Sequence, residues 1–277
     1  MLGRVTDPVK IALTGAPETM LATLYGRALD AASPNSVLHD HYAADAVARI
    51  DYDFSKTKIK GTQAVGVALR ARQLDDWTAE FLTAHREATV LHLACGLDTR
   101  VFRINPPESV RWVDVDYPDV IALRRALLPG RDGDYRMIES SVTDGAWLEA
   151  IPADRPTLAV FEGLTMYLTE AEGQSLIRRI TGRFPSGQLA FDCYGSIGIK
   201  LQKLVPAVRN AGATLHWGID DPGQIEALHP GLRCRNDLRS TDVAGEEHLP
   251  LSGRIQMKVI SHIPALRDIG RIMRFSF

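Results

Sequence analysis

A glycine and an aspartate lie twenty residues apart, each at the end of a short apolar run. Gly96 ends the run "VLHLACG" and Asp116 ends the run "VRWVDVD". A glycine has no side chain to keep a ligand away from the backbone, and it readily adopts positive φ. A carboxylate about twenty residues after such a turn can accept hydrogen bonds from the two hydroxyls of a ribose. The pair therefore favours a ligand that contains ribose over a bare phosphate or a metal ion.

The turn at Gly96 has one glycine, whereas the dinucleotide-binding pattern G-x-G-x-x-G has three. Asp98 would put a negative charge beside a pyrophosphate, and like charges at that range repel. S-adenosylmethionine contains ribose, lacks phosphate and carries sulfonium and ammonium groups. We therefore expect S-adenosylmethionine rather than a nicotinamide or flavin dinucleotide. For these two residues alone, the alternative is a plain turn glycine and a helix-capping aspartate.

Three further charged residues could reach the same ligand, the two arginines provided that their helix folds over the sheet as a lid. Glu162 follows the apolar run "LAVF", so it emerges where ligands bind to parallel sheets. Arg70 and Arg72 lie on an amphipathic segment, and a guanidinium binds a carboxylate through paired hydrogen bonds. The alternatives are an acid that interacts with a helix dipole and arginines on a solvated helix face.

The elements that must position these residues follow from the pattern of the chain. From residue 89 onward, short apolar runs alternate with helical patterns, which is typical of a doubly wound α/β fold. The predicted helices are 117–128, 145–151 and 170–184, and residues 212–253 are less regular. We expect a mostly parallel, Rossmann-like sheet of seven strands, at 89–95, 110–116, 135–140, 157–163, 187–195, 254–263 and 269–277.

The first 88 residues have a mostly helical pattern. Apolar residues recur at three- and four-residue spacing within 17–50, and 63–85 forms a second amphipathic segment. We interpret 1–88 as a helical lid over the sheet, and 89–277 as the ligand-binding domain with an acceptor-side insert around 195–253. Because the helices alone would make a thin core, we expect one integrated domain.

Composition excludes several classes of protein. The chain has 277 residues with 32 basic and 34 acidic side chains, a balance that argues against a nucleic-acid binder. No apolar stretch is long enough to span a membrane, and the start of the chain has no apolar core of signal-peptide length. The three cysteines are far apart, which predicts neither a disulfide frame nor a metal site. We expect a cytoplasmic protein with reduced thiols.

Six ordered motifs resemble those of a known family. The runs "LHLACGLDTRVFRI", "WVDVDYPDVIALRRALL", "SSVTDGAWLEAI" and "LAVFEGLTMYLTEAEGQSLIRRI" follow "LATLYGRALDAASPNSVLHD" and "ALRARQLDD". Together they resemble the leucine carboxyl methyltransferase-like family, and within it the tetracenomycin polyketide O-methyltransferase type. The resemblance implies a class I methyltransferase fold that uses S-adenosylmethionine. Ala94 departs from the family pattern, which more often has glycine there.

The resemblance also implies roles for individual residues. Gly96 resembles the glycine under the methionine part of the cofactor, and Asp116 resembles the ribose-binding acid. Glu162 resembles an acid close to the methionyl ammonium. The other matches are Ser141 and Val142 beside the adenine, Arg70 on the methionine carboxylate, and Arg27 as a basic residue of the lid.

The methyl acceptor leaves more alternatives open. A carboxylate acceptor is already ionised, whereas a phenol or enol must lose a proton. Tyr194, just after the fifth run, and His216 are the candidates for contacting or deprotonating an acceptor. We expect O-methylation of a small-molecule carboxylate or hydroxyl, such as a polyketide-like secondary metabolite. The alternatives are methylation of a protein C-terminus and a non-catalytic module that retains the cofactor pocket.

Overall fold

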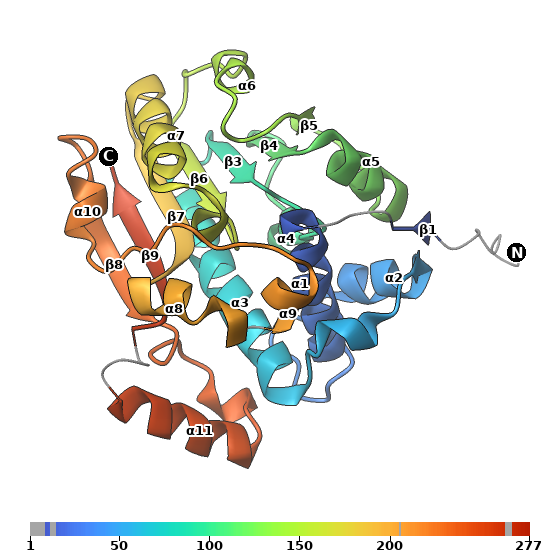
Figure 1. The fold of residues 1–277 in the computed structure, drawn as a ribbon. Coiled ribbons are helices and arrows are strands. Elements are labelled where there is room, and N and C mark those ends of the chain that lie inside the picture. The colour runs from blue at the N-terminus through green and yellow to red at the C-terminus, as the bar shows by residue number, and fades with distance from the viewer. Residues whose placement is uncertain (1–8, 12–14, 205, 264–267) are drawn as a thin grey trace, which may run out of the picture.

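A seven-stranded sheet in the order β5-β4-β3-β6-β7-β9-β8 forms the centre of the computed structural model, which describes residues 9–11, 15–204, 206–263 and 268–277. Neighbouring strands are parallel except at β9, which is antiparallel to both β7 and β8. The doubly wound, mostly parallel sheet is therefore confirmed (Figure 1). The strands are β3 (Thr89–Leu93), β4 (Arg111–Asp116), β5 (Tyr135–Glu139), β6 (Thr157–Phe161), β7 (Gly187–Tyr194), β8 (Arg233–Arg239) and β9 (Gly270–Ser276).

Helices and one pair of short strands lie around this sheet. The short strands β1 (Val9–Lys10) and β2 (Ile50–Asp51) pair in parallel away from it. The α-helices are α1 (Ala16–Ala31), α2 (His41–Arg49), α3 (Gly61–Ala84), α4 (Arg100–Ile104), α5 (Pro118–Leu127), α6 (Ala146–Glu149), α7 (Glu170–Arg183), α8 (Ser196–Lys200), α9 (Pro206–Asn210), α10 (Gly223–Glu226) and α11 (Leu251–His262). The 3₁₀ turns are η1 (Phe54–Thr57), η2 (Thr165–Tyr167), η3 (Gln202–Leu204) and η4 (Glu246–His248).

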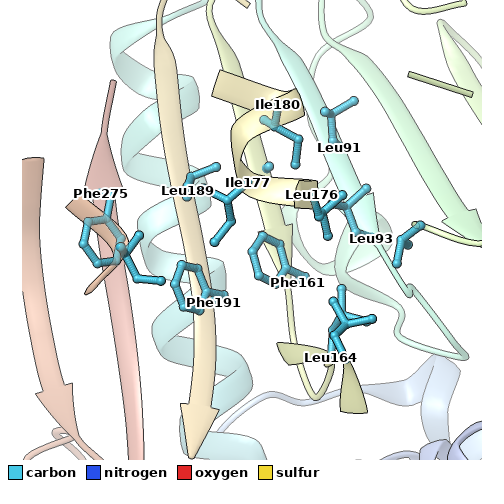
Figure 2. Packing of buried hydrophobic residues seen from close by; sticks show 14 of the residues in the cluster. Leu91, Leu93, Phe161, Leu164, Leu176, Ile177, Ile180, Leu189, Phe191 and Phe275 are labelled. Carbon is cyan, nitrogen blue, oxygen red and sulfur yellow. The ribbon is translucent and has the colours of Figure 1, made fainter. Parts of the chain in front are cut away.

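The central strands are buried on both faces. Successive residues of a strand point to opposite faces, and successive positions in these strands are apolar. On one face, Leu91, Phe161 and Phe191 pack against α7. The Phe161 and Phe191 rings stack with their centroids 4.9 Å apart. Figure 2 shows Leu176 and Ile177 of α7 pointing towards these strands. This face fixes the positions at which the strands end, and hence the positions of the residues that follow them.

On the opposite face, the long helix α3 covers the sheet. Leu74, Trp77 and Phe81 of α3 belong to one buried cluster with Val90 and Val160 of the central strands. In Figure 1, α3 runs behind the sheet while α7 lies in front of it. The N-terminal segment therefore shares its core with the sheet, and α3 is held rigidly relative to the strand ends.

The structure corrects one predicted strand. Residues 254–263 were expected to be a strand because Ile255, Met257 and Val259 alternate with polar residues. Residues 254–262 belong to helix α11, which begins at Leu251 and ends at His262. The seventh strand is β8, within the less regular stretch 212–253. Short apolar runs do not distinguish the two periods. As a helix, α11 leaves Leu251, Ile255 and Val259 more than half exposed, and Figure 1 shows it apart from the sheet.

Candidate functional site

A cavity of about 340 Å³ lies where β3, β4, β6 and β7 end and α1 and α3 pass over them. It is the place at which parallel α/β sheets bind ligands. Helix α1 contributes Met20 and Thr23, and α3 contributes Val67. The sequence-predicted residues that line the cavity are Arg27, Arg70, Gly96, Asp98, Asp116, Ser141, Val142, Glu162 and Tyr194. His216 is not among the lining residues.

The turn after β3 is held by the acid that ends β4. The backbone N–H of Gly96 donates to Oδ2 of Asp116 over 2.7 Å, and the N–H of Tyr117 donates to Oδ1 over 2.8 Å. Gly96 has φ +49°, and a Cβ atom there would lie 3.4 Å from the Met20 side chain. Burial raises the pKa of Asp116, although the two N–H groups oppose that shift. The turn and the carboxylate thus form one wall of the cavity.

Ala94 also adopts a left-handed conformation, with φ +48°. A Cβ atom makes this region unfavourable for residues other than glycine. The backbone geometry explains why a glycine suits the position better, and it shows that the chain keeps the turn despite the alanine. Two positive φ values within three residues therefore shape a turn that lines the cavity.

Arg70 lies between two carboxylates. Its Nε donates to Oε1 of Glu162 over 3.1 Å, and a terminal nitrogen donates to Oδ2 of Asp192 over 3.0 Å. Burial alone would raise the pKa of Glu162, but the charges of Arg70 and Arg100 outweigh it and lower that pKa. The Arg70 side chain keeps 23% exposure while both acids are almost fully buried. A guanidinium is therefore presented to the cavity at a fixed position.

Arg72, the other arginine considered on this helix, is directed elsewhere. It donates to the backbone oxygen of Ala244 over 2.6 Å and does not line the cavity. Arg27 of α1 does line it, and donates to the backbone oxygen of Leu97 in the β3 turn over 3.2 Å. Arg27 is also 3.4 Å from Asp40. Helix α1 is thus tied to the turn by a buried guanidinium.

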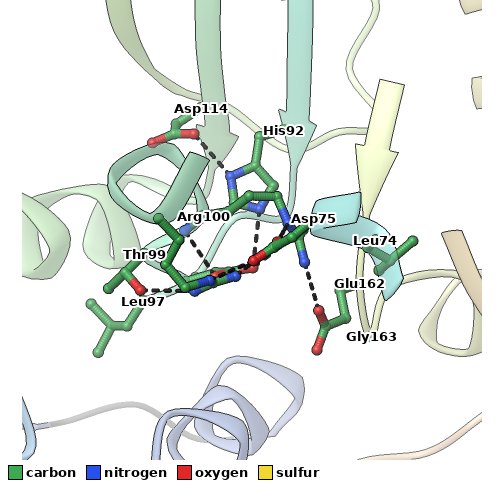
Figure 3. Close-up of polar contacts among 12 residues, drawn as sticks. Leu74, Asp75, His92, Leu97, Thr99, Arg100, Asp114, Glu162 and Gly163 are labelled. Atoms are coloured by element: carbon green, nitrogen blue, oxygen red, sulfur yellow. Dashed lines mark hydrogen bonds and ion pairs between the residues drawn. The ribbon is translucent and has the colours of Figure 1, made fainter. Parts of the chain in front are cut away.

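Asp98 lies one residue before Thr99, the N-cap of helix α4, and joins a network of ion pairs. Its Oδ1 accepts from the backbone N–H of Arg100 over 3.0 Å and from Arg103 over 2.9 Å. Burial alone would raise its pKa, but Arg100 and Arg103 hold that pKa well below its usual range. Figure 3 shows Arg100 between Asp75 and Glu162 in the same network. Asp98 therefore accepts a backbone N–H from the start of α4 without being its N-cap residue, and it also lies at the cavity wall.

Ser141 and Val142 follow β5 on the Asp116 side of the cavity. The hydroxyl of Ser141 lies 2.7 Å from that of Thr143. The backbone oxygen of Val142 accepts from the Trp147 ring nitrogen over 3.4 Å. These contacts fix a short loop that borders the cavity beside Tyr117 and Val120.

The remaining part of the cavity is mostly apolar. Tyr194 follows Asp192 on β7, and burial raises its pKa. Tyr167 lies nearby in η2, and burial raises its pKa to about 12. His216 is exposed, and its backbone N–H donates to the oxygen of Met166 over 2.7 Å. The other linings of this part are Met20, Ile59, Val67, Met166, Leu168, Val208 and Leu215.

Sequence reasoning missed two residues of this site. Asp192 was not singled out, although an acid within the apolar run "LAFDCYG" is an unusual occupant of a central strand. Asp75, which accepts from both Arg100 and Arg103, lies on a helix face where solvated acids are common. Only the three-dimensional structure shows that Asp75 of α3 faces buried arginines.

The strand order, the single antiparallel strand and the cavity at the strand ends define a class I methyltransferase fold. A Thermobifida fusca protein described as a methyltransferase shares this fold with a TM-score of 0.54 and 17% identity, over 90% of this chain and 93% of that chain. The leucine carboxyl methyltransferase family matches residues 20–181.

The full-length relatives are closer in sequence. The tetracenomycin polyketide synthesis O-methyltransferase TcmP of Streptomyces glaucescens is 44% identical over 96% of this chain and 98% of its own length. The S-adenosyl-L-methionine-dependent methyltransferase dpfgK of Gibberella zeae is 43% identical over 86% of this chain and 87% of its own length. The chain belongs to the leucine carboxyl methyltransferase family, and the predicted cofactor is confirmed at the level of that family.

No helix within the described parts of the chain combines the length and apolar character needed to cross a bilayer.

Proposed function

We propose that this chain transfers the methyl group of S-adenosylmethionine to an oxygen of a small, polyketide-like molecule. The observation that carries the proposal is the cavity that joins Gly96, Asp116, Arg70 and Glu162 to an apolar compartment. Its polar end suits a zwitterionic, cationic nucleoside, and its apolar end suits a flat organic acceptor. The name of TcmP supports an oxygen acceptor.

The residues present fit the cofactor. Gly96 leaves the space that a Cβ atom would take against Met20, so the methionine part can pass over the turn. Each oxygen of Asp116 accepts one N–H and retains a second lone pair for a ribose hydroxyl. Arg70 is the guanidinium available to the methionine carboxylate, and Glu162 is the acid available to the ammonium. Ser141 and Val142 would border the adenine.

The bound cofactor supplies an electrophilic methyl group on a sulfonium, and the protein positions the acceptor oxygen in line with it. Within the described lining, His92 and the acids Asp98 and Glu162 are held by charged partners, so none is a free base. The raised pKa of Tyr194 keeps its hydroxyl protonated. These features favour an acceptor that binds already ionised, and a carboxylate meets that requirement without a base.

N-terminal helices α1 and α3 act as the lid of the site in this proposal. Residues 195–232 supply Val208 and Leu215 to the acceptor end, so the acceptor-side insert is restricted to the part before β8. The unpaired thiols of Cys95, Cys193 and Cys234 suit the cytoplasm.

Titration calorimetry and a labelled methyl donor test the proposal. We expect the protein to bind S-adenosylmethionine and not NADH. We expect label from the donor to enter a panel of aromatic polyketide acids as base-labile ester. Base-stable product would indicate an ether instead, and labelled peptide C-termini would favour the protein carboxyl reaction. Binding of the donor with no product from any acceptor would leave a non-catalytic binding module.

A further inference from the structure

A continuous network of buried charged side chains, called the charge network below, lies beneath the polar end of the cavity. Arg27 and Arg103 both contact Asp40, and Arg103 and Arg100 both contact Asp75. Figure 3 shows the middle of this charge network, where Arg100 links Asp75 to Glu162. Its members are Arg27, Asp40, Arg103, Asp75, Asp98, Arg100, Glu162, Arg70 and Asp192.

This charge network has five carboxylates and four guanidiniums, so it carries one negative charge in excess when the adjoining His92 is neutral. The adjoining pair of Asp114 and Arg124 adds no net charge. Among the described residues, the further ion-pair partner of these five acids is His92, 3.6 Å from Asp98, which adds a positive charge only when it is protonated. A buried charge without a counter-charge is costly, so the excess predicts a cationic ligand in the adjacent cavity.

Asp192 lies at one end of the charge network, and Arg70 is its ion-pair partner. Its Oδ2 lies 3.0 Å from Arg70, and its Oδ1 accepts the backbone N–H of Gly163 over 2.6 Å. Asp192 is buried and does not itself line the cavity, whereas Arg70 and Gly163 do. Its effect on a ligand is therefore transmitted through these two neighbours and through its charge.

We propose that Asp192 positions Arg70 for the cofactor carboxylate and supplies the excess charge by which the site prefers the cationic methyl donor to its neutral product. This inference rests on the proposed function. The donor has a net charge of +1 from its sulfonium, ammonium and carboxylate. During transfer the methyl–sulfur bond breaks, its electron pair stays on sulfur, and a methyl–oxygen bond forms with an electron pair of the acceptor. The remaining thioether has no net charge, so it loses the attraction to the buried excess.

The test is the ratio of affinities for S-adenosylmethionine and S-adenosylhomocysteine, measured by calorimetry. We expect Asp192→Asn to weaken donor binding roughly tenfold more than product binding, as expected for one unit charge several ångströms away in a partly screened site. Asp192→Glu retains the charge and should keep the ratio close to that of the wild type. If Asp192 only positioned Arg70, Asp192→Asn would weaken both ligands equally, and that result would overturn the inferred preference for the cationic donor.

Asp237→Asn is the matched control, because Asp237 of β8 forms a 2.7 Å pair with Arg271 away from the cavity. It should leave both affinities unchanged. If Asp192→Asn does not fold, Asp192→Ser removes the same charge with less bulk and should lower the ratio in the same way. Failure of the wild type to bind either ligand would instead refute the proposed function itself.

Discussion

Asp116 and Gly96 are joined by a 2.7 Å hydrogen bond from the glycine backbone N–H to the aspartate carboxylate. The bond connects the turn after β3 to the end of β4, twenty residues later. It shows that the acid shapes the turn before any ligand arrives. Because its second oxygen accepts from Tyr117, the carboxylate is fixed in orientation towards the cavity.

Replacing Asp116 by alanine should weaken the binding of S-adenosylmethionine by about 1 to 3 kcal/mol, since charge-assisted hydrogen bonds to the ribose are lost. Calorimetry measures the change. Glu139→Ala is a suitable control, because Glu139 ends the neighbouring strand β5 but its side chain is exposed and pairs with Arg125. Equal affinity in Asp116→Ala and the wild type would remove the ribose assignment.

The Asp116–Gly96 pair was predictable because its two residues follow consecutive parallel strands, and such strands end at one edge of the sheet. The same logic located Glu162, after β6. These assignments need only the order of strands along the chain.

The charge network around Arg100 was not predictable in the same way. Asp75 and Arg100 come from different helices, and their contact depends on how α3 and α4 pack. Helix α11 was mistaken for a strand because Ile255, Met257 and Val259 alternate with polar residues as in a strand, and packing rather than this short pattern decides the structure. The sequence therefore predicts which residues lie at the strand ends, whereas contacts between helices can be identified only from the three-dimensional structure.

The arginine that faces the cofactor is testable by comparing two neighbours on α3. Arg70→Ala should weaken donor binding by about 1 to 3 kcal/mol, because the methionine carboxylate loses its guanidinium. Arg72→Ala should leave the affinity unchanged, since Arg72 contacts Ala244 outside the cavity. Arg70→Lys should recover only part of the loss, because an ammonium cannot hold Glu162 and Asp192 in the same planar geometry. If Arg72→Ala shows the larger effect on the binding isotherm, the two assignments are reversed.

Ala94 offers a stabilising substitution. Its φ of +48° is strained for a residue with a Cβ atom, so Ala94→Gly should raise the free energy of unfolding by about 1 kcal/mol. Urea unfolding measures the gain. Ala88→Gly is the control: Ala88 is fully buried and lies outside the positive-φ set, so glycine there should destabilise the protein. A loss of stability in Ala94→Gly would show that the turn is not strained.

Asp114 should make the stability depend on pH. Burial opposes its ionisation, but Arg124 and other partners lower its pKa to about 2. Because this value is below that of the unfolded chain, the stabilisation is fully present above about pH 4 and is lost as the pH falls towards 2. Asp114→Asn should therefore cost roughly 2 kcal/mol or more at pH 7, and the difference from wild type should shrink by roughly 1 kcal/mol at pH 3.

Urea titrations at the two pH values measure this change. Glu149→Gln serves as the control, because the Glu149 side chain of α6 is exposed and has no ion pair among the described residues. It should behave like the wild type at both pH values. A constant difference between Asp114→Asn and wild type would show that Asp114 titrates normally in the folded protein.

The acceptor end separates two candidate residues. His216→Ala should leave the rate of methyl transfer unchanged, since His216 is exposed and does not line the cavity. Tyr194→Phe should alter the KM for the acceptor without changing the dependence of kcat on pH, because Tyr194 lines the cavity while its raised pKa keeps it protonated. Steady-state kinetics with an aromatic polyketide acid measures both. If Tyr194→Phe abolished an alkaline or acid limb of the kcat profile, the tyrosine would act in proton transfer and the acceptor would be a hydroxyl rather than a carboxylate.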